Sequence, residues 1–328
     1  MYKNFTFKNI LLTLALLACG YFVAQLFNYS KLSDESIEHV GTEYMEKYNV
    51  YALKTPDKLF FAGEEVPLDR WDIKESFDRE LLVNTYWQSQ TLLFLKRANR
   101  YFPIIEPILK KQGVPDDFKY LALIESGLIP TVVSPAGATG FWQFMKPTAR
   151  DYKLEVNNEV DERYNIEKST RAACKYLKDS YKKFGSWALV AASYNAGRTH
   201  INSQMKLQDA GSYYDLLLGE EPARYVFRII ATKLIMENPQ GFGFRYRESD
   251  LYPNIPTRKI KITGPVKNFA DFAKENGANY KILKHFNPWL RKPYLTNKYK
   301  KQYEITLPAK GYINFAFSEY KKPQVKKK

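Results

Sequence analysis

The stretch at residues 121–143, with the sequence LALIESGLIPTVVSPAGATGFWQ, begins as a helix and continues into a loop. Phe118, Leu121, Ala122 and Glu125 are spaced i, i+3, i+4 and i+7, and these positions lie on one face of a helix. Because a carboxylate among apolar neighbours loses hydration, the pKa of Glu125 is expected to rise. A carboxylic acid that stays protonated near neutral pH can act as a general acid, so Glu125 is the candidate catalytic residue.

Small and flat residues follow the predicted helix. Gly127 is expected to end it, and residues 134–140, with the sequence SPAGATG, form a loop of small residues. Small residues let a ligand approach the backbone closely. Phe141 and Trp142 then offer flat faces of the kind that pack on sugar rings, and Gln143 adds an amide donor and acceptor. An ordinary core position explains Trp142 equally well.

Three short motifs occur in order: Glu-Ser at residues 125–126, Gly-Phe-Trp-Gln at residues 140–143 and Ala-Ser-Tyr-Asn-Ala-Gly at residues 192–197. Together they resemble the catalytic domain of the lytic transglycosylases in the goose-lysozyme-like superfamily, above all the membrane-bound lytic transglycosylase D type. The sequence departs from the family pattern at Phe141, where leucine is usual, and at Ser193, where alanine is usual. Neither departure touches the candidate acid.

The resemblance implies a mainly α fold, with a lysozyme-like helical catalytic domain followed by a small α+β LysM-like domain. It also implies cleavage of the β-1,4 bond between N-acetylmuramic acid and N-acetylglucosamine in peptidoglycan, with formation of a 1,6-anhydromuramic end. Glu125 would protonate the leaving oxygen and then take the proton of the C6 hydroxyl. Most glycosidases need a second carboxylate. Since none lies near Glu125 in the sequence, the substrate's N-acetyl group is expected to stabilise the cation.

Further residues of the motifs are expected to contact the substrate. These are Ser126, Ser134, Gly140, Phe141, Trp142, Gln143, Tyr194, Asn195, Tyr225 and Glu221. Tyr225 matches a late tyrosine of the family, in a Glu-x-x-x-Tyr segment that begins at Glu221. Two alternatives stay open: Tyr194 packs in the core beside Trp187, and Glu221 is an ordinary glutamate of a first helical turn.

The composition bounds the classes of function. The chain of 328 residues is long enough for two domains, is 45% hydrophobic and 16% aromatic, and carries a net charge of +15. This charge fits a wall polymer or anionic lipid, whereas nucleic acid is not expected because no recognition motif is present. The histidines His39, His200 and His285 are scattered, so neither a metal nor another cofactor is predicted. A hydrolytic muramidase and a non-catalytic peptidoglycan-binding protein remain alternatives, and other cell-wall enzymes or regulators are conceivable partners.

The N-terminus, residues 1–29, is predicted to be a signal peptide or a membrane anchor. A basic flank precedes the apolar residues 10–27. The sequence LLAC ending at Cys19 resembles a lipoprotein cleavage box, but the apolar run continues beyond Cys19 and favours an uncleaved anchor equally. Both alternatives predict an exported, membrane-associated protein that faces the periplasm of a Gram-negative-type bacterium. Residues 30–76 are predicted to be a tether that leads into the first domain, with packing of residues 51–53 and 59–62 onto that domain as the alternative.

The remaining chain is predicted to form two domains and a tail. Residues 77–250 are dominated by helical periodicity and make up the lytic transglycosylase domain. Residues 257–310 follow a strand-helix-helix-strand order that resembles a LysM module. The usual Gly-Asp-Thr after the first strand is absent, because residues 264–267 are GPVK, which puts sugar contacts of this module in doubt. Residues 311–328 form a basic tail.

Three helix boundaries are predicted from local signals. A helix that contains the apolar residues 81–95 is expected to end near Tyr101, before a second one begins. Asp116 or Asp117 is expected to cap the helix of Glu125. Asp161 and the glutamate after it are expected to cap the long helix that follows them.

Overall fold

The computed structural model describes residue 21 and residues 50–313. The described residues from Leu53 onward belong to one compact unit. This unit contains a large core between helices and a smaller core near the C-terminus. We call residues 53–253 the larger lobe and residues 257–309 the smaller lobe. The mainly α fold class predicted from the sequence is confirmed.

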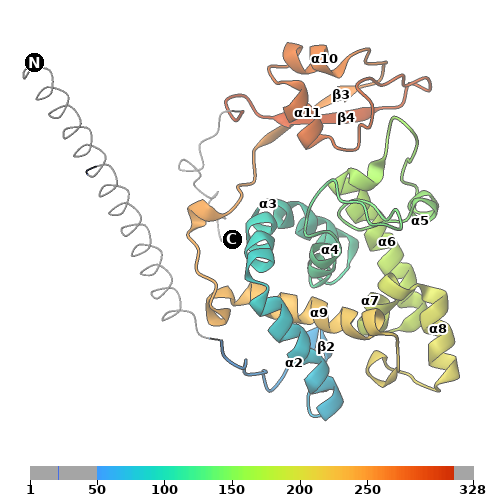
Figure 1. Cartoon of the computed structure of the whole chain (residues 1–328). Helices are drawn as coiled ribbons and strands as arrows, with labels where there is room; N and C mark the ends of the chain where they lie inside the picture. Colours follow the sequence, from blue (N-terminus) through green and yellow to red (C-terminus); the bar gives the residue numbers. More distant parts are fainter. Residues whose placement is uncertain (1–20, 22–49, 314–328) are drawn as a thin grey trace, which may run out of the picture. The chain divides into compact units, whose positions relative to one another are not determined.

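The larger lobe is a bundle of helices around a short central one. Its α-helices are α2 (Trp71–Tyr86), α3 (Gln88–Gln112), α4 (Phe118–Ser126), α5 (Lys146–Asp151), α6 (Ile166–Phe184), α7 (Trp187–Ala196), α8 (Arg198–Leu207) and α9 (Glu220–Glu237). Single 3-10 turns complete it: η1 (Glu162–Tyr164), η2 (Tyr213–Asp215), η3 (Pro239–Phe242) and η4 (Glu248–Asp250). Helix α4 packs on α3 and α9, and Figure 1 shows it in the middle of the lobe. The helix that carries Glu125 is therefore the one that the others surround.

The chain joins the core of the larger lobe earlier than the sequence analysis predicts. Residues 30–76 are predicted as a tether, but β1 (Phe60–Phe61) and β2 (Glu64–Glu65) form an antiparallel hairpin within them. Phe61 is fully buried, and its ring lies 5.6 Å from that of Phe118 on α4. The alternative that residues 59–62 pack onto the first domain therefore describes this part, and the tether prediction does not.

Asp117 stands at the N-cap of α4, but its side chain makes no capping hydrogen bond. Its Oδ2 instead accepts a hydrogen bond from the backbone N–H of Ala62 at 2.6 Å and from Nζ of Lys233 at 2.7 Å. The predicted capping role is therefore wrong. Asp117 ties the hairpin and α9 to the start of α4, a long-range function that local sequence signals do not reveal.

The cap of α6 also differs from the prediction. Asn165 is the N-cap residue, and its side chain accepts the hydrogen bond of the Lys168 N–H at 3.0 Å. Asp161 caps the preceding 3-10 turn η1 instead, through the N–H of Arg163 at 3.2 Å. Glu162 lies inside that turn. The chain thus makes two successive caps where one was predicted.

The predicted helix end near Tyr101 is wrong, because α3 runs through this point. The break comes earlier, at Trp87, between α2 and α3. Pro103 and Pro107 lie inside α3 four residues apart and are both exposed, so their missing N–H groups fall on the outer face. Buried residues such as Ile105 hold the opposite face on the core. Packing therefore overrides the local helix-breaking signal.

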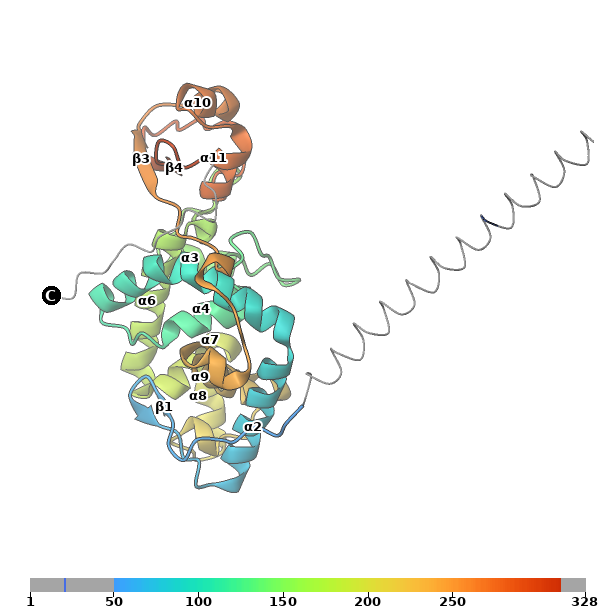
Figure 2. The same cartoon turned by 90° about the vertical axis from the view of Figure 1, so that its left-hand side faces the viewer.

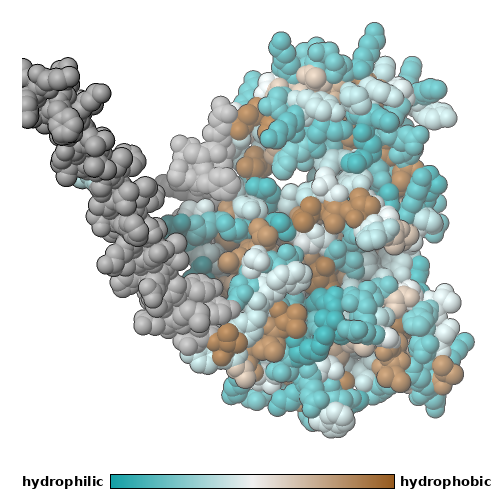
Figure 3. Space-filling view, in the orientation of Figure 1, coloured by the Kyte–Doolittle hydropathy of each residue, from teal (hydrophilic) through white to brown (hydrophobic). Residues whose placement is uncertain are grey.

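The smaller lobe has the strand-helix-helix-strand order that the sequence predicts. Its elements are β3 (Thr257–Ile262), α10 (Phe269–Glu275), α11 (Tyr280–Phe286) and β4 (Tyr303–Pro308). The strands are antiparallel, with Thr257 opposite Pro308 and Ile262 opposite Tyr303. Figure 2 shows the two helices close to these strands, and the face of this lobe in Figure 3 is mostly hydrophilic.

Residues 155–165, which we call the junction segment, connect the two lobes. The backbone N–H of Asp161 donates to the carbonyl of Trp289 at 2.9 Å, and that of Arg291 donates to the carbonyl of Glu159 at 2.7 Å. The side chains of the segment that belong to the smaller core are Val160 and Tyr164. A piece of the larger lobe is therefore built into the core of the smaller one.

Within residues 50–313 and at Tyr21, no helix has the length and apolar character needed to cross a membrane. The predicted signal peptide or anchor at residues 1–29, which includes Cys19, lies outside the described residues apart from Tyr21. Most of the predicted basic tail also lies outside them.

The β1–β2 hairpin caps helix α7 from a distance. Glu64 accepts hydrogen bonds from the backbone N–H groups of Trp187 at 2.5 Å and Ala188 at 3.2 Å, and from the hydroxyl of Ser186 at 2.9 Å. The first N–H groups of a helix have no partner within the helix, and a negative charge there is favourable. Glu64 thus holds the helix that ends in the third sequence motif.

Replacement of Glu64 by alanine should lower the free energy of unfolding by about 1–2 kcal/mol, because two N–H groups of α7 lose their partner. Urea unfolding followed by circular dichroism measures this loss. The neighbouring Glu65 is exposed and makes no such cap, so Glu65→Ala is the matched control and should cost less than about 0.5 kcal/mol. Equal losses in both variants would contradict the capping role.

Candidate active site

Glu125 lies on the last turn of α4, where Gly127 ends the helix with a left-handed φ of 57°. Its carboxyl group is only partly exposed. The hydroxyl of Tyr225 donates a hydrogen bond to its Oε1. Tyr225 belongs to α9 and is 2% exposed, so the phenol is held rigidly beneath the carboxyl group. The packing of α4 on α9 thus brings together two residues that lie 100 positions apart.

The pKa of Glu125 is raised to about 7, and burial is the largest cause. The negative charge of Glu221 raises the pKa further. The hydrogen bond from Tyr225 and the positive charge of Arg228 act in the opposite direction. The direction agrees with the expectation from the apolar face of α4. Near neutral pH the group therefore exchanges readily between its protonated and its ionised form.

A cluster of charges that sequence analysis missed lies behind this carboxyl group. Glu80 of α2 is fully buried, and its Oε1 lies 2.6 Å from Arg79 Nη1 and 2.6 Å from Arg224 Nε. Its Oε2 lies 3.3 Å from Nε of Arg228. The terminal nitrogens Nη1 and Nη2 of Arg228 donate to the two carboxylate oxygens of Glu221, at 2.8 and 3.1 Å. Arg228 is thereby fixed between two carboxylates.

The loop at residues 134–143, which we call the substrate loop, is held by its own backbone and by Arg163. Gly140 has φ +77°, and a Cβ atom there would lie 2.2 Å from the carbonyl oxygen of Arg163. The guanidinium of Arg163 donates to the carbonyls of Gly137 and Phe144, both at 3.1 Å. Only glycine fits this approach, and so Gly140 serves the loop's fold.

Three residues that are predicted to contact substrate use their side chains in hydrogen bonds with nearby backbone groups. The hydroxyl of Ser126 donates to the carbonyl of Ala122 at 2.9 Å and is buried. The hydroxyl of Ser134 accepts the hydrogen bond of the Ala138 N–H at 3.0 Å. The amide of Gln143 donates to the carbonyl of Gly140 at 2.9 Å. A Ser134 or Gln143 contact with substrate would use the remaining lone pairs of these partly exposed groups.

The flat faces predicted at Phe141 and Trp142 are buried. Phe141 is 2% exposed and packs edge-on against Tyr101 at 5.0 Å. Trp142 has no exposed surface, and its indole N–H donates to Thr170 at 2.9 Å. The stacking of a sugar on Trp142 is therefore a wrong prediction, because apolar packing takes the whole ring. The core alternative describes Trp142.

The third motif lies at the end of α7. Tyr194 is partly buried, and its hydroxyl donates to the carbonyl of Trp142 at 2.6 Å, which links α7 to the substrate loop. Burial raises the pKa of Tyr194 well above its usual value, and the charge of Glu125 adds to this effect. Asn195 is exposed. Tyr194 thus lies near Glu125 and braces the loop, whereas Asn195 is accessible to a ligand.

The described residues contain no group of histidine, cysteine and acidic side chains arranged to hold a metal ion. Cys174 is a free and buried thiol whose pKa burial raises to about 12. Glu125, with its pKa of about 7, is the group of this site that can transfer a proton near neutral pH.

Comparison with protein families gives two matches. A model of the transglycosylase SLT domain matches residues 102–217, which include α4, the substrate loop and α7. A model of the soluble lytic transglycosylase C-terminal LysM-like domain matches residues 258–311. Tyr225 and the buried Glu80 lie outside both matches.

Individual proteins are similar over larger or smaller parts. The membrane-bound lytic murein transglycosylase D of Escherichia coli K12 is 29% identical over 241 residues, which are 70% of this chain and 51% of that protein. The membrane-bound lytic murein transglycosylase F of Salmonella typhi is 30% identical over 34% of this chain and 24% of its own length. The structure of the 70-kDa soluble lytic transglycosylase of Escherichia coli covers 43% of this chain and 24% of its own, with 20% identity and a TM-score of 0.37.

The chain spans about half the length of the transglycosylase D that it matches. Both domain matches occur in the order that the two lobes have in the structure. The chain contains a transglycosylase SLT domain followed by the LysM-like domain of soluble lytic transglycosylases.

Proposed function

We propose that this chain is a peptidoglycan lytic transglycosylase that uses Glu125 as both its acid and its base. The observation that carries this proposal is the carboxyl group of Glu125, which has a pKa of about 7 and a hydrogen bond from a rigid tyrosine. The match to the SLT domain supports the same reaction class. The substrate is the β-1,4 bond between N-acetylmuramic acid and N-acetylglucosamine.

The first step transfers the proton of Glu125 to the glycosidic oxygen. The bond between this oxygen and the anomeric carbon breaks, and positive charge develops on the muramic sugar. Glu125 becomes a carboxylate, to which the Tyr225 hydroxyl still donates. Hydrogen bonds to a charged acceptor are the stronger ones. Tyr225 therefore stabilises the state that follows proton transfer more than the state before it.

The second step returns the proton. As the C6 oxygen of the muramic sugar bonds to the anomeric carbon, its hydroxyl proton passes to the Glu125 carboxylate, and the 1,6-anhydro ring closes. A hydrolysing enzyme would need another carboxylate to activate water or to act as nucleophile. Glu221 is the acid whose charge acts on Glu125, but both its oxygens accept hydrogen bonds from Arg228. This arrangement favours the lytic reaction over the hydrolytic alternative.

The remaining substrate contacts belong to the same proposal. The backbone of the substrate loop, the free lone pairs of Ser134 and Gln143, and the exposed amide of Asn195 are the groups available to a glycan. Tyr194 acts on the glycan indirectly, because its hydroxyl is used to hold the loop.

We also infer export and attachment to a membrane through residues 1–29, in the periplasm of a Gram-negative-type bacterium. The basic and apolar N-terminal sequence supports this inference, and two similar proteins carry the description membrane-bound. Lipid on Cys19 and an uncleaved anchor remain the two forms of attachment, and the mass of the mature N-terminus distinguishes them.

Replacement of Glu125 by glutamine should reduce lysis of peptidoglycan at least about a hundredfold, because the amide cannot donate and recover the proton. Zymography on a peptidoglycan gel measures the loss, and circular dichroism checks the fold. The exposed Glu220 offers a control of the same chemistry on α9, and Glu220→Gln should keep full activity. A clear lytic band from Glu125→Gln would remove Glu125 from the mechanism.

The soluble products should carry 1,6-anhydromuramic ends, because the C6 oxygen and not water closes the reaction. Mass spectrometry distinguishes these ends from reducing ends, which contain one more water molecule. Reducing ends alone would identify a hydrolytic muramidase, and binding without any product would identify a non-catalytic wall-binding protein.

The rate should fall as the pH rises through about 7, because only protonated Glu125 can donate. Glu221→Gln removes a negative charge that raises the pKa of Glu125 and releases Arg228, whose charge lowers it. This basic limb should therefore move toward acid by roughly half a pH unit. Glu220→Gln should leave the limb in place. A shift toward alkali in Glu221→Gln would contradict the assigned electrostatics.

A further inference from the structure

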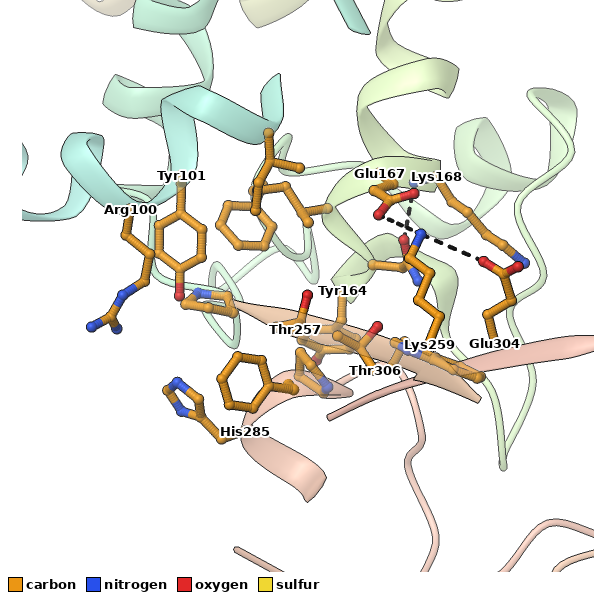
Figure 4. A pocket seen from close by; sticks show the side chains of 18 of the residues that line it. Arg100, Tyr101, Tyr164, Glu167, Lys168, Thr257, Lys259, His285, Glu304 and Thr306 are labelled. Carbon is orange, nitrogen blue, oxygen red and sulfur yellow. Dashed lines mark hydrogen bonds and ion pairs between the residues drawn. The ribbon is translucent and has the colours of Figure 1, made fainter. Parts of the chain in front are cut away.

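A cavity of about 450 Å³ lies between the two lobes, and we call it the interlobe pocket (Figure 4). Helix α3 and the start of α6 provide its walls on the side of the larger lobe, and strands β3 and β4 and the end of α11 provide those on the other side. Glu125 does not line it. Ligand pockets have volumes of about 300–1,000 Å³ and are frequent where domains meet.

Rigid aromatic rings form part of the wall. Tyr164 and Trp289 line the pocket and are 6% and 4% exposed. The guanidinium of Arg291 lies 4.2 Å from the ring of Tyr164, and Tyr303 stacks on Trp289 at 5.7 Å. Tyr101 adds a third ring from α3. Because Tyr164 and Trp289 are almost fully buried, each offers a ligand only a small apolar contact area, whereas the partly exposed Tyr101 can pack on a sugar ring.

The charged groups of the pocket have a positive balance. Its cations are Arg100, Lys168, Arg171 and Lys259, and its carboxylates are Glu167 and Glu304. Lys259 lies 2.7 Å from Glu167 and 3.4 Å from Glu304, so these groups largely satisfy one another. Arg100 is different: in the described part of the chain no carboxylate lies within ion-pair distance of it, and its Nε donates to the carbonyl of Pro253. One end of the pocket therefore offers an uncompensated guanidinium.

Neutral hydrogen-bonding groups complete the lining. Figure 4 shows Arg100 and Tyr101 at one end, with Thr257 and Thr306 on the strands and His285 below. Burial and the charge of Arg100 lower the pKa of His285, so its imidazole is neutral near pH 7 and both donates and accepts. Hydroxyls and a neutral imidazole suit sugar hydroxyl and acetamido groups.

We propose that the interlobe pocket binds a short muramic-acid-containing glycan, with a sugar ring against Tyr101 and its carboxylate at Arg100. Such a fragment combines flat rings, hydroxyls and one negative charge, which are the features that this lining complements. This inference rests on the proposed function, which supplies the polymer. The pocket's positive balance disfavours the chain's own basic residues 321–328 as occupant.

Binding is measured on the full chain with Glu125→Gln, which prevents turnover. The probe is the disaccharide of N-acetylglucosamine and 1,6-anhydro-N-acetylmuramic acid without peptide, and neutral chitobiose is the matched ligand. Calorimetry gives the affinity. The side-chain NMR signals of the histidines report the position, since among those in residues 50–313 His285 lines the pocket and His200 does not. We expect the anionic sugar to bind and to raise the pKa of His285, because its carboxylate offsets the charge of Arg100.

Two variants locate the ligand. Arg100→Gln should weaken binding of the anionic disaccharide at least about tenfold, because a charge-assisted hydrogen bond is lost. Thr306→Trp should fill the cavity and abolish the His285 response. Lys261→Gln removes one charge from strand β3 without lining the pocket and should leave the affinity unchanged. Thermal unfolding confirms that each variant is folded.

Binding that is unaffected by both Arg100→Gln and Thr306→Trp would overturn the proposal, because the ligand would then lie elsewhere. Equal affinity for chitobiose would overturn the role of Arg100, and no binding of either sugar to the folded protein would overturn the site. The proposed function fails separately: wild-type protein would then give no lytic band, while the His285 response to the disaccharide would persist.

Discussion

The hydrogen bond between Tyr225 and Glu125 depends on the packing of α4 on α9, and the candidate site depends on that hydrogen bond. Burial alone would leave a neutral acid that gives up its proton at a high cost, since an isolated charge in an apolar environment is strongly disfavoured. Tyr225 offsets part of this cost for the ionised form, and the resulting pKa near 7 allows the group to donate and recover a proton at similar ease. Other parts of the larger lobe help to keep α4 and α9 together. The β1–β2 hairpin is held to the start of α4 by Asp117, which also binds Lys233 of α9.

The junction segment gives the smaller lobe a mechanical connection to the substrate loop. Arg163 donates to the carbonyl of Gly137 in the loop and to that of Phe144 directly after it. Its own carbonyl oxygen occupies the space that a side chain at Gly140 would need. The same segment donates the N–H of Asp161 to the smaller lobe and places Val160 and Tyr164 in its core. Because Asp161 forms a buried ion pair with Arg163 at 2.8 Å, displacement of the smaller lobe would disturb the residue that holds the loop. The smaller lobe therefore contributes to the fold of the larger lobe, whatever it binds.

Sequence reasoning found the parts of the site that local patterns encode. The spacing of apolar residues around Glu125 is enough to predict a raised pKa, and the Glu-x-x-x-Tyr pattern pointed to Tyr225 without showing that it touches the acid. The roles of Phe141 and Trp142 could not be decided, because an aromatic residue after a small-residue loop has the same sequence signal on a surface and in a core.

Glu80 and Arg228 could not be found from local sequence patterns for a different reason. They lie 148 positions apart, on α2 and α9, and only the packing of these helices makes them a pair. The sequence leaves packing of residues 59–62 as an alternative but does not predict their strand pairing, because two-residue strands carry almost no periodicity.

Arg228 poses a problem that the charge cluster resolves. A guanidinium near a catalytic acid would normally form an ion pair with it, and such a pair would keep the carboxyl group ionised and useless as a proton donor. In this protein Glu80 and Glu221 occupy the hydrogen-bonding edges of Arg228, so its charge reaches Glu125 only through space. The full burial of Glu80 is consistent with this function, because a buried ion pair adds little net stability but fixes one geometry firmly. Glu80 and Glu221 thus restrain Arg228, and this restraint keeps its guanidinium from an ion pair with the carboxyl group of Glu125.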